Sequence, residues 1–453
     1  MIEVLHTTLA FVVAIALLVA VHEFGHFLVA RKLGIKVEKF SIGFGPALFS
    51  WRSRDGEVLY VIAAIPLGGY VKMFGENPDE EGGEARTTLS EAERARAFDV
   101  QPVWKRAAVA VAGPGFNFLF AIVAYAMVGW IGQNVIPPVI GNVAPASLAE
   151  RAGMESGDRI LKVDGSAMHS WSQIEEALKG VTGRDANFDL LREGNEFQVT
   201  VHVPTPAKDP WLINVADDLL GMSPGLKIVI AKVVPGSPAE KSGIRSGDVI
   251  RLLNGRTYSD VGQLIEEIRA QGAQMLNVGI DRDGTLLDIR VQPEADAQGN
   301  VRIGVMLAAQ AMLGEEVYRM GPLTGAFYGF ERTWEMTALT VQVVGKMLTA
   351  AISPDNLGGP IAIAQMAGKT AELGLVSFLT FLALISVNLA VLNLFPVPVL
   401  DGGHLLYLGL EKLRGRPLSP KVMGFTQIVG VALIVALMVF AFYNDLSRLD
   451  WSR

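Results

Sequence analysis

The chain has 453 residues, half of them apolar, with a formal net charge of −7 and no cysteine. Without cysteine, disulfides and thiolate metal sites are excluded, so any bound metal must use His, Asp or Glu. The chain has no Lys-rich or Arg-rich run of the kind that indicates a nucleic-acid partner. Residues 135–310 have the mixed charge and Gly/Pro punctuation of soluble domains, whereas long apolar stretches lie towards both ends. The composition therefore predicts a membrane protein with a soluble insert.

Four segments are apolar enough and long enough to cross a bilayer, which takes about 20 helical residues. They are residues 5–30, 107–131, 373–395 and 424–444. The first has no basic start and no small-residue cleavage site, which favours a retained span over a cleaved signal peptide. We therefore expect a multi-pass α-helical membrane protein with four spans.

The first span, within residues 1–30, contains the sequence His22-Glu23-Phe-Gly-His26. Two imidazoles four residues apart lie on one helical face and can share a metal ion, with Glu23 beside them to transfer a proton. A charged group at the centre of a span costs about 2.5–3.5 kcal/mol, so ionisable residues within spans usually have a function. The alternative is that the motif lies at the membrane interface, where polar residues cost little.

Residues 31–106 begin and end with basic residues, which are retained on the cytoplasmic side of membrane proteins. This segment is therefore predicted to be cytoplasmic, which places both termini and the insert on the outer side. Residues 41–49 and 60–73 are apolar and punctuated by glycine, and they predict membrane-associated β-structure. They could enter the membrane as hairpins or could form simple β-structure at its interface.

The insert is an internal repeat. The sequence from Val143 to Gly153 recurs from Val233 to Gly243, an offset of 90 residues. The two copies, residues 132–220 and 221–310, resemble bacterial PDZ domains. PDZ domains capture peptides or chain termini by adding a strand to their own sheet. The alternative is that the copies only occupy space above the membrane and restrict access.

Residues 321–352 are aromatic and apolar but carry several charges, which predicts an amphipathic helix along the membrane surface. A fifth span here would reverse the direction of the following one. Residues 403–423 are predicted to form a basic cytoplasmic loop before the last span. In the second span, residues 112–117 are mostly small, which indicates close helix packing.

Two histidines leave a catalytic zinc site incomplete, because such sites normally take three protein ligands. Residues 373–402 form the third span and its proline-broken end, which leads to Asp401. With four spans, this helix runs inward and Asp401 reaches the depth of His22 and His26. His404, three residues further on, is the competing candidate.

The HisGluPheGlyHis motif, the sequence AsnLeuPheProValProValLeuAspGly at 393–402 and the repeated insert together resemble the site-2 protease family. The resemblance covers essentially the whole chain. It implies that zinc is bound by His22, His26 and Asp401, in preference to His404, and that Glu23 is catalytic. It further implies a re-entrant β-loop and an edge strand that pair with substrate. The residues implied in substrate binding are Gly43, Phe44, Gly45, Asn393, Pro396 and Pro398.

This resemblance implies an intramembrane zinc metalloprotease of the bacterial inner membrane, acting in regulated intramembrane proteolysis. Its expected substrates are single-span proteins already shortened by another protease, of the anti-sigma-factor type, or remnant signal peptides. One alternative is a non-catalytic PDZ adaptor, which would have no need of Glu23. Another is a transporter, which predicts inverted repeats of spans that the sequence does not show.

Overall fold

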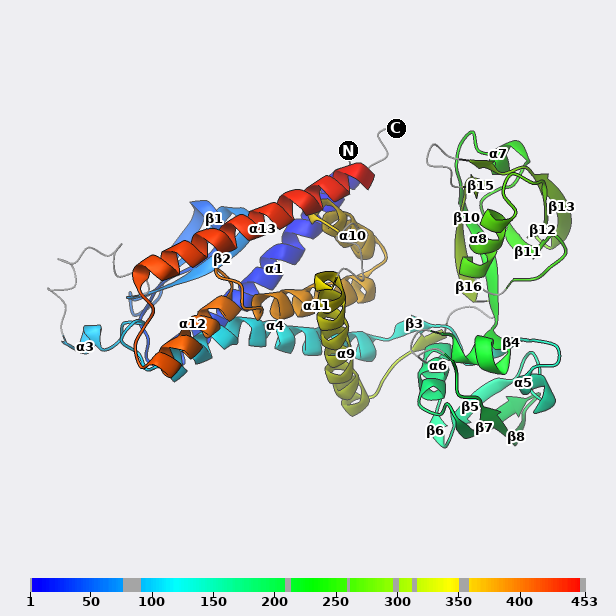
Figure 1. Ribbon diagram of the computed structural model, residues 1–453, viewed down its shortest axis with the longest axis horizontal. Helices are drawn as coiled ribbons and strands as arrows, with labels where there is room; N and C mark the ends of the chain where they lie inside the picture. The colour runs from blue at the N-terminus through cyan, green and yellow to red at the C-terminus, as the bar shows by residue number, and fades with distance from the viewer. Residues whose placement is uncertain are drawn as a thin grey trace. The chain divides into compact units, whose positions relative to one another are not determined.

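The computed structural model describes residues 2–75, 91–207, 213–258, 261–295, 301–311, 316–349 and 358–448. The chain forms two compact units (Figure 1). Met1–Gln133 and Arg319–Arg453 form the first, here called the helical unit, and Asn134–Tyr318 form the second, here called the insert. Within the helical unit, Met320 N donates a hydrogen bond to Gly129 O at 2.9 Å. The chain therefore leaves and re-enters the helical unit at one place.

The helical unit is built mainly from helices. These are α1 (Ile2–Lys32), α3 (Glu91–Arg94), α4 (Val103–Ile131), α9 (Pro322–Leu348), α10 (Pro360–Glu372), α11 (Leu375–Asn393), α12 (Asp401–Arg414) and α13 (Pro420–Arg448). Among the described residues, four segments are long and apolar enough to cross a membrane: Val4–Lys32, Val103–Ile131, Leu375–Asn393 and Lys421–Ser447. The prediction of four apolar helices is confirmed, and each lies within a few residues of its expected position.

Helix α4 is the central element of the helical unit and contacts α1, α9, α11 and α12 (Figure 1). Its crossing with α1 depends on small residues, as predicted for residues 112–117. A Cβ on Gly25 of α1 would lie only 2.4 Å from the Ala112 oxygen of α4. There is no room for a side chain between the two backbones at this point. The helices therefore approach each other closely, and polar groups of both helices come into contact.

Two helices in the C-terminal half differ from the expectations. Residues 403–423 were expected to be a loop, but α12 begins at Asp401 and continues to Arg414. Its buried side chains include Tyr407 and Leu408, and its acidic first turn and basic last turn suit the helix dipole. Helix α10 was not predicted, because it is too short and too weakly apolar to register as a span. It packs closely on α1, where a Cβ on Gly368 would lie 2.4 Å from Thr7 Oγ1.

Helix α9 corresponds to the amphipathic helix expected at residues 321–352, of which 350–352 lie outside the described residues. One face packs on α4 through Gly329, where a Cβ would lie 2.3 Å from the Ile122 oxygen. The same face reaches α11, where Thr340 Oγ1 donates to Asn388 Oδ1 at 2.8 Å. The opposite face exposes Leu323, Phe327, Phe330 and Trp334. The placement of α9 along the membrane surface stays a prediction.

The predicted β-structure of residues 41–49 and 60–73 is present as two long strands, β1 (Val37–Arg52) and β2 (Leu59–Met73). Ser41 lies opposite Tyr70 and also opposite Val61. The first half of β1 therefore lies between the two halves of β2, and the second half of β2 forms an edge among the described strands. Buried residues of both strands pack against α1 in a common core.

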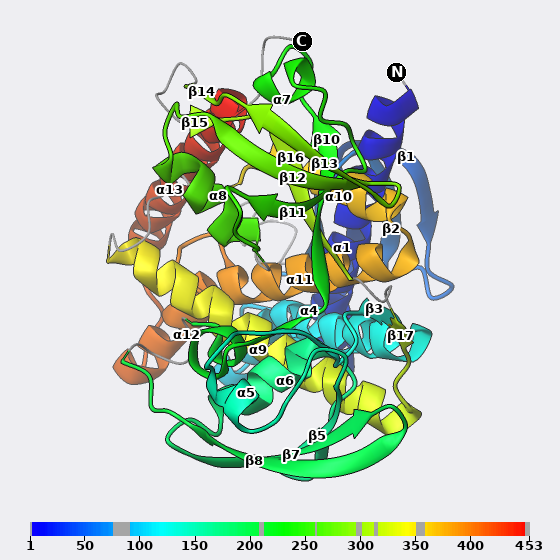
Figure 2. The ribbon, with the colours of Figure 1, turned by 90° about the vertical axis from the view of Figure 1, so that its right-hand side faces the viewer.

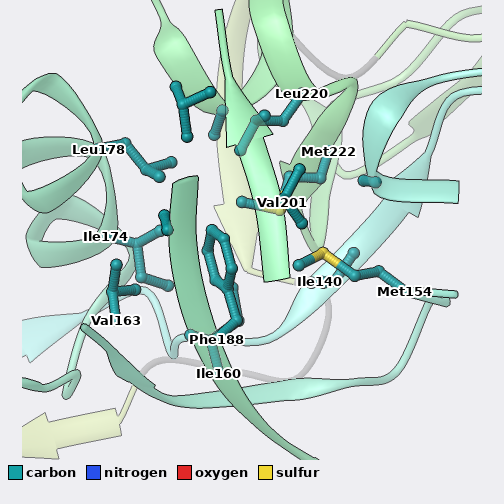
Figure 3. Packing of buried hydrophobic residues seen from close by; sticks show 14 of the residues in the cluster. Ile140, Met154, Ile160, Val163, Ile174, Leu178, Phe188, Val201, Leu220 and Met222 are labelled. Carbon is teal, nitrogen blue, oxygen red and sulfur yellow. The ribbon is translucent and has the colours of Figure 1, made fainter. Parts of the chain in front are cut away.

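The first half of the insert, here called module 1, has its own core. Its elements are β3 (Gln133–Val135), β4 (Ile140–Val143), α5 (Leu148–Arg151), β5 (Arg159–Val163), β6 (Ser166–Ala167), α6 (Trp171–Lys179), β7 (Arg184–Arg192), β8 (Asn195–Val203), the π-helical turn η2 (Ala216–Leu220) and β9 (Met222–Pro224). The main sheet has the order β6-β5-β7-β8, of which β5, β7 and β8 can be followed in Figure 2. Phe188, Ile140 and Met222 meet in the core (Figure 3). Because Met222 belongs to this core, module 1 continues past the predicted boundary at residue 220.

The second half, module 2, repeats the arrangement. Its elements are β10 (Leu226–Val233), α7 (Pro238–Lys241), β11 (Val249–Leu253), α8 (Val261–Ala270), β12 (Leu276–Arg282), β13 (Thr285–Val291), β14 (Glu294–Ala295), β15 (Val301–Arg302) and β16 (Val305–Ala311). The last strand of the insert, β17 (Glu316–Tyr318), pairs with β3 instead. Its five-stranded sheet has the order β13-β12-β11-β10-β16.

The sequence repeat is also a structural repeat. In module 1, Arg192 Nε donates to the buried Asp158 Oδ1 at 2.6 Å; in module 2, Arg282 Nε donates to the buried Asp248 Oδ1 at 2.7 Å. Each pair ties the Gly-Asp turn to a strand of the main sheet, and each partner is 90 residues from its counterpart. The two modules therefore share local structure as well as sequence.

Candidate metal centre

The two histidines of α1 converge on one point in the middle of the helical unit. His22 and His26 are each 9% exposed, and their Nε2 atoms lie 3.2 Å apart. The other ring nitrogen of His26, Nδ1, lies 2.8 Å from the Val109 oxygen of α4. A carbonyl oxygen can only accept, so Nδ1 of His26 carries the proton and its Nε2 presents a lone pair.

Asp401, the first residue of α12, completes this cluster. Its Oδ2 lies 3.2 Å from His22 Nε2 and its Oδ1 lies 3.5 Å from His26 Nε2. Among the described residues, only His22, His26 and Asp401 bring three potential ligand atoms this close together, within 4.8 Å. His404 is not part of the group.

The geometry of the three residues fits zinc. Two ligands at about 2.0 Å from a tetrahedral ion lie about 3.3 Å apart, close to the observed separations. Asp401 Oδ2 is buried but has no aligned hydrogen-bond donor within the described chain. A cation between the Asp401 carboxylate and the two imidazole nitrogens would satisfy this buried oxygen.

Helix α4 contributes a glycine that the sequence interpretation assigned only to packing. A Cβ on Gly113 would lie 2.2 Å from His26 Nε2 and 2.8 Å from His22 Cε1. The absence of a side chain here leaves room for the converging imidazoles. One turn later, Asn117 Nδ2 lies 3.0 Å from His22 Nδ1. The sequence feature that could have indicated this role is the four-residue spacing of Gly113 and Asn117, which places both on one helical face.

Glu23 lies beside the histidines, half-buried, and faces strand β2. A Cβ on Gly69 would lie 3.0 Å from Glu23 Cγ, so the β2 backbone runs directly against this side chain. Gly69 is thus a second glycine at the site that sequence reasoning did not single out. The edge strand and the carboxylate are neighbours.

The loop Gly43-Phe44-Gly45 lies in β1 and reaches the same part of β2. Gly43 and Gly45 have φ angles of 93° and 87°, which residues with a side chain rarely adopt. The Phe44 ring stacks on Tyr70 with ring centroids 6.2 Å apart. It also covers Gly68, where a Cβ would lie 2.3 Å from the ring. The loop therefore contacts the strand that borders Glu23, although 45% of the Phe44 surface remains exposed.

The remaining predicted substrate residues lie in the break between α11 and α12. Asn393 is the last residue of α11, and Pro396 and Pro398 follow it in the connection to Asp401. Val399 in this connection has φ of 90°, a strained value for a β-branched residue. The break thus brings Asp401 to the histidines through a constrained segment. The roles of Asn393 and the two prolines stay predictions.

Three side chains whose spacing fits zinc, next to a carboxylate within an apolar helix, are the arrangement expected of a membrane-embedded metal-dependent hydrolase. Peptidase family M50 matches residues 10–437. The chain belongs to this family, and it is a zinc metalloprotease, as predicted. This assignment decides against the adaptor interpretation.

Curated relatives are similar to this chain over nearly its full length. The chain is 40% identical to Protease RseP of Yersinia pestis, which covers 99% of this chain and 100% of the relative. It is 38% identical to Regulator of sigma-E protease RseP of Escherichia coli, covering 97% and 98%. A protein of Ralstonia nicotianae named as a zinc metalloprotease, RSc1411, is 41% identical and covers 98% of both chains.

Among solved structures, the PDZ domain of an SdrC-like protein from Listeria innocua aligns with 18% of this chain and 92% of its own. The identity is 17% and the TM-score is 0.17. The PDZ assignment of the two modules stays a prediction.

Proposed function

We propose that this zinc metalloprotease hydrolyses peptide bonds within the transmembrane segments of single-span proteins in the bacterial inner membrane. The observation that carries the proposal is that His22, His26 and Asp401 converge at helices that are long and apolar enough to cross a membrane. Relatives named as regulators of sigma-E protease support substrates of the anti-sigma-factor type, already shortened by another protease. Remnant signal peptides are a second substrate of the same chemistry.

In this proposal the metal is held by His22, His26 and Asp401. Zinc bound there supplies a Lewis acid that polarises the peptide carbonyl and acidifies water. Glu23 accepts the proton of the attacking water and returns it to the leaving amine nitrogen. Its contact with the β2 backbone keeps the carboxylate beside the path of an extended substrate.

The substrate is expected to bind as a strand. A transmembrane helix satisfies its peptide groups internally, so it must unwind before hydrolysis, and the freed groups need partners. The second half of β2 offers an edge next to Glu23. We propose that this edge pairs with the unwound segment, that Gly43, Phe44 and Gly45 support it, and that the Asn393 amide binds an exposed peptide group. Pro396 and Pro398 then border the substrate at the break before Asp401.

The insert is proposed to lie on the periplasmic side together with both chain termini. Basic residues at both ends of 31–106 support a cytoplasmic position for that segment and hence this orientation. As PDZ domains, the two modules either bind peptides or chain termini, or exclude substrates with bulky outer domains.

The decisive experiment compares the wild-type protein, Glu23→Gln and a chelator-treated sample on a fluorescent single-span substrate in proteoliposomes. Loss of the general base should lower cleavage by about 10²–10⁴-fold while the zinc content stays that of the wild type. Chelation should abolish cleavage, and added zinc should restore it. Cleavage by Glu23→Gln at the wild-type rate would rule out the proposed mechanism.

The third ligand is tested separately by measuring zinc content in two alanine variants. Asp401→Ala should lose zinc, because Asp401 lies 3.2 and 3.5 Å from the two imidazole nitrogens. His404→Ala should retain it, because His404 lies outside the ligand group. The reverse result would assign the third ligand to His404.

A further inference from the structure

Asn117 of α4 contacts a proposed metal ligand on the side away from the metal. It is fully buried, and its Nδ2 lies 3.0 Å from His22 Nδ1. Its Oδ1 is also buried and has no hydrogen-bond partner within the described chain. An orphaned buried acceptor is costly, and here it belongs to the side chain that touches His22.

The three positions of α4 that face the histidines lie four residues apart on one helical face. Val109 O holds His26 Nδ1 at 2.8 Å, Gly113 leaves room for both rings, and Asn117 reaches His22 Nδ1. One stripe of α4 therefore contacts both imidazoles. At His26 the partner is a carbonyl oxygen, which fixes the proton on Nδ1 and frees Nε2.

His22 needs the same arrangement to bind a metal through Nε2. If Asn117 donated through Nδ2, Nδ1 of His22 would be the acceptor, and the proton of the neutral ring would lie on Nε2. That proton would point towards His26 Nε2 and Asp401 Oδ2, each 3.2 Å away. The two ends of a side-chain amide have nearly the same shape, so hydrogen-bond chemistry decides which end faces a partner.

We propose that Asn117 is a positioning residue for His22: its Oδ1 accepts the Nδ1 proton, which directs the Nε2 lone pair of His22 to the metal. This orientation gives Oδ1 a donor and moves Nδ2 to the position without a partner, so the need of His22 for a free Nε2 lone pair decides between the two orientations. The inference rests on the proposed metal site and adds to it the residue that selects the metal-binding form of one ligand.

The test measures zinc affinity of the full-length protein in detergent by competition with a chromophoric chelator. Asn117→Leu removes both polar ends at similar size and should weaken zinc binding by about 10–100-fold. Asn117→Asp keeps an acceptor at the same place and should stay within about threefold of the wild type. Asn117→Ala provides a smaller variant without an acceptor and should resemble Asn117→Leu.

Ser386→Ala is the matched control for a merely structural role. Ser386 is fully buried on α11 and its Oγ donates to the backbone oxygen of Asn117 at 2.8 Å. This variant loosens the same helix contact but leaves the Asn117 side chain in place, so its zinc affinity should equal that of the wild type. Thermal unfolding of each metal-free variant reports whether the fold is retained.

A spectroscopic readout addresses the proton directly. The chain has six histidines, and ¹⁵N-labelled histidine with a His22→Gln reference identifies the His22 signals. The zinc-bound wild type should show His22 protonated on Nδ1, and Asn117→Leu should lose that signal pattern.

The outcomes separate the two proposals. Wild-type protein that binds no zinc would overturn the metal site itself. Tight zinc binding by the wild type and equally tight binding by folded Asn117→Leu would overturn only the role of Asn117. Weak binding by Asn117→Asp, with a retained fold, would show that acceptor chemistry is not what Asn117 contributes.

Discussion

Gly113 lies where any side chain would enter the space between the two histidines. A Cβ would lie 2.2 Å from His26 Nε2, far inside the contact distance of two atoms. Gly113→Ala is therefore expected to push the imidazoles apart and to abolish stoichiometric zinc binding. Atomic absorption on the purified variant measures the zinc content, and circular dichroism measures whether the helices persist.

Gly115→Ala is the matched control for this prediction. Gly115 lies two residues away on the same helix, but a Cβ there would meet nothing within 4 Å. Its zinc content should equal that of the wild type, and a helical alanine in place of glycine should be neutral or slightly stabilising. Full zinc occupancy in Gly113→Ala would contradict the steric argument.

The proposed site residues differ in how far the sequence indicates them. His22, Glu23 and His26 follow from local helical spacing, which a single segment encodes. Predicting Asp401 as the third ligand required the topology of the whole helical unit and the family resemblance, because no local feature distinguishes it from His404. Gly113 and Asn117 act through a helix crossing between segments about 90 residues apart, and hydropathy does not encode which faces meet.

Helix α12 is fixed to α4 by an ion pair at the opposite end from Asp401. Arg106 Nη1 lies 3.1 Å from Glu411 Oε2 and Arg106 Nη2 lies 2.5 Å from Glu411 Oε1, in a two-point contact. Both side chains are mostly buried, with 14% and 17% exposed. Removing one partner of a buried pair typically costs about 3–5 kcal/mol. We expect Arg106→Glu or Glu411→Arg alone to lower the thermal midpoint clearly and to reduce zinc content.

The exchanged double variant, Arg106→Glu with Glu411→Arg, restores opposite charges and should recover part of the loss. A double-mutant cycle on the unfolding midpoints measures the coupling. Strictly additive losses would show that the pair does not fix α12 to α4.

Module 2 offers a pH prediction at its Gly-Asp turn. Burial raises the pKa of the Asp248 carboxyl, but the Arg282 side chain and the Arg245 backbone N–H outweigh it, so the pKa is lowered. A folded-state pKa below the unfolded value of about 3.9 means that the stabilisation is complete above that pH and is lost as the pH falls below it. Hydrogen exchange within residues 226–311 of the full chain should therefore stay constant from neutral pH to about pH 5, after correction for intrinsic rates, and show reduced protection below about pH 4.

Asp248→Asn should lower the protection of module 2 at neutral pH, by roughly 1–3 kcal/mol, and flatten the acid-dependent loss. Asp283→Asn, the same change at an exposed residue next to Arg282, is the control and should leave both unchanged. An acid-dependent loss of equal size in Asp248→Asn would assign it to other groups.

The sequence predicts a helix or strand correctly where a single feature, such as continuous hydropathy or a glycine-punctuated apolar stretch, extends over the whole element. The four apolar helices follow from continuous hydropathy, and the paired strands of 37–73 follow from apolar stretches with glycine. Helices α10 and α12 were missed because their burial comes from contacts with distant helices. Ala367 of α10, for example, is buried in a cluster with Leu18 of α1 and Phe381 of α11.

At the scale of the whole molecule, the chain segments that flank the insert meet within the helical unit. Met320 N bonds to Gly129 O at 2.9 Å, so the insert can be exchanged for a short Gly/Ser linker without separating the helices. All proposed metal ligands and Asn117 belong to the helical unit. A variant with residues 134–318 replaced in this way is therefore expected to bind zinc as the wild type does.

The same variant tests what the insert does. If the modules exclude bulky outer domains, the variant should cleave a substrate with a short outer segment at the wild-type kcat/KM and should also cleave one with a large folded outer domain. The wild type should discriminate strongly between the two substrates, and the variant should not. Unchanged discrimination would exclude the filter. If the variant retained zinc but lost activity on the short substrate, substrate binding would instead be assigned to the modules. The helical unit alone would then hold a complete metal site but would be unable to bind its substrate.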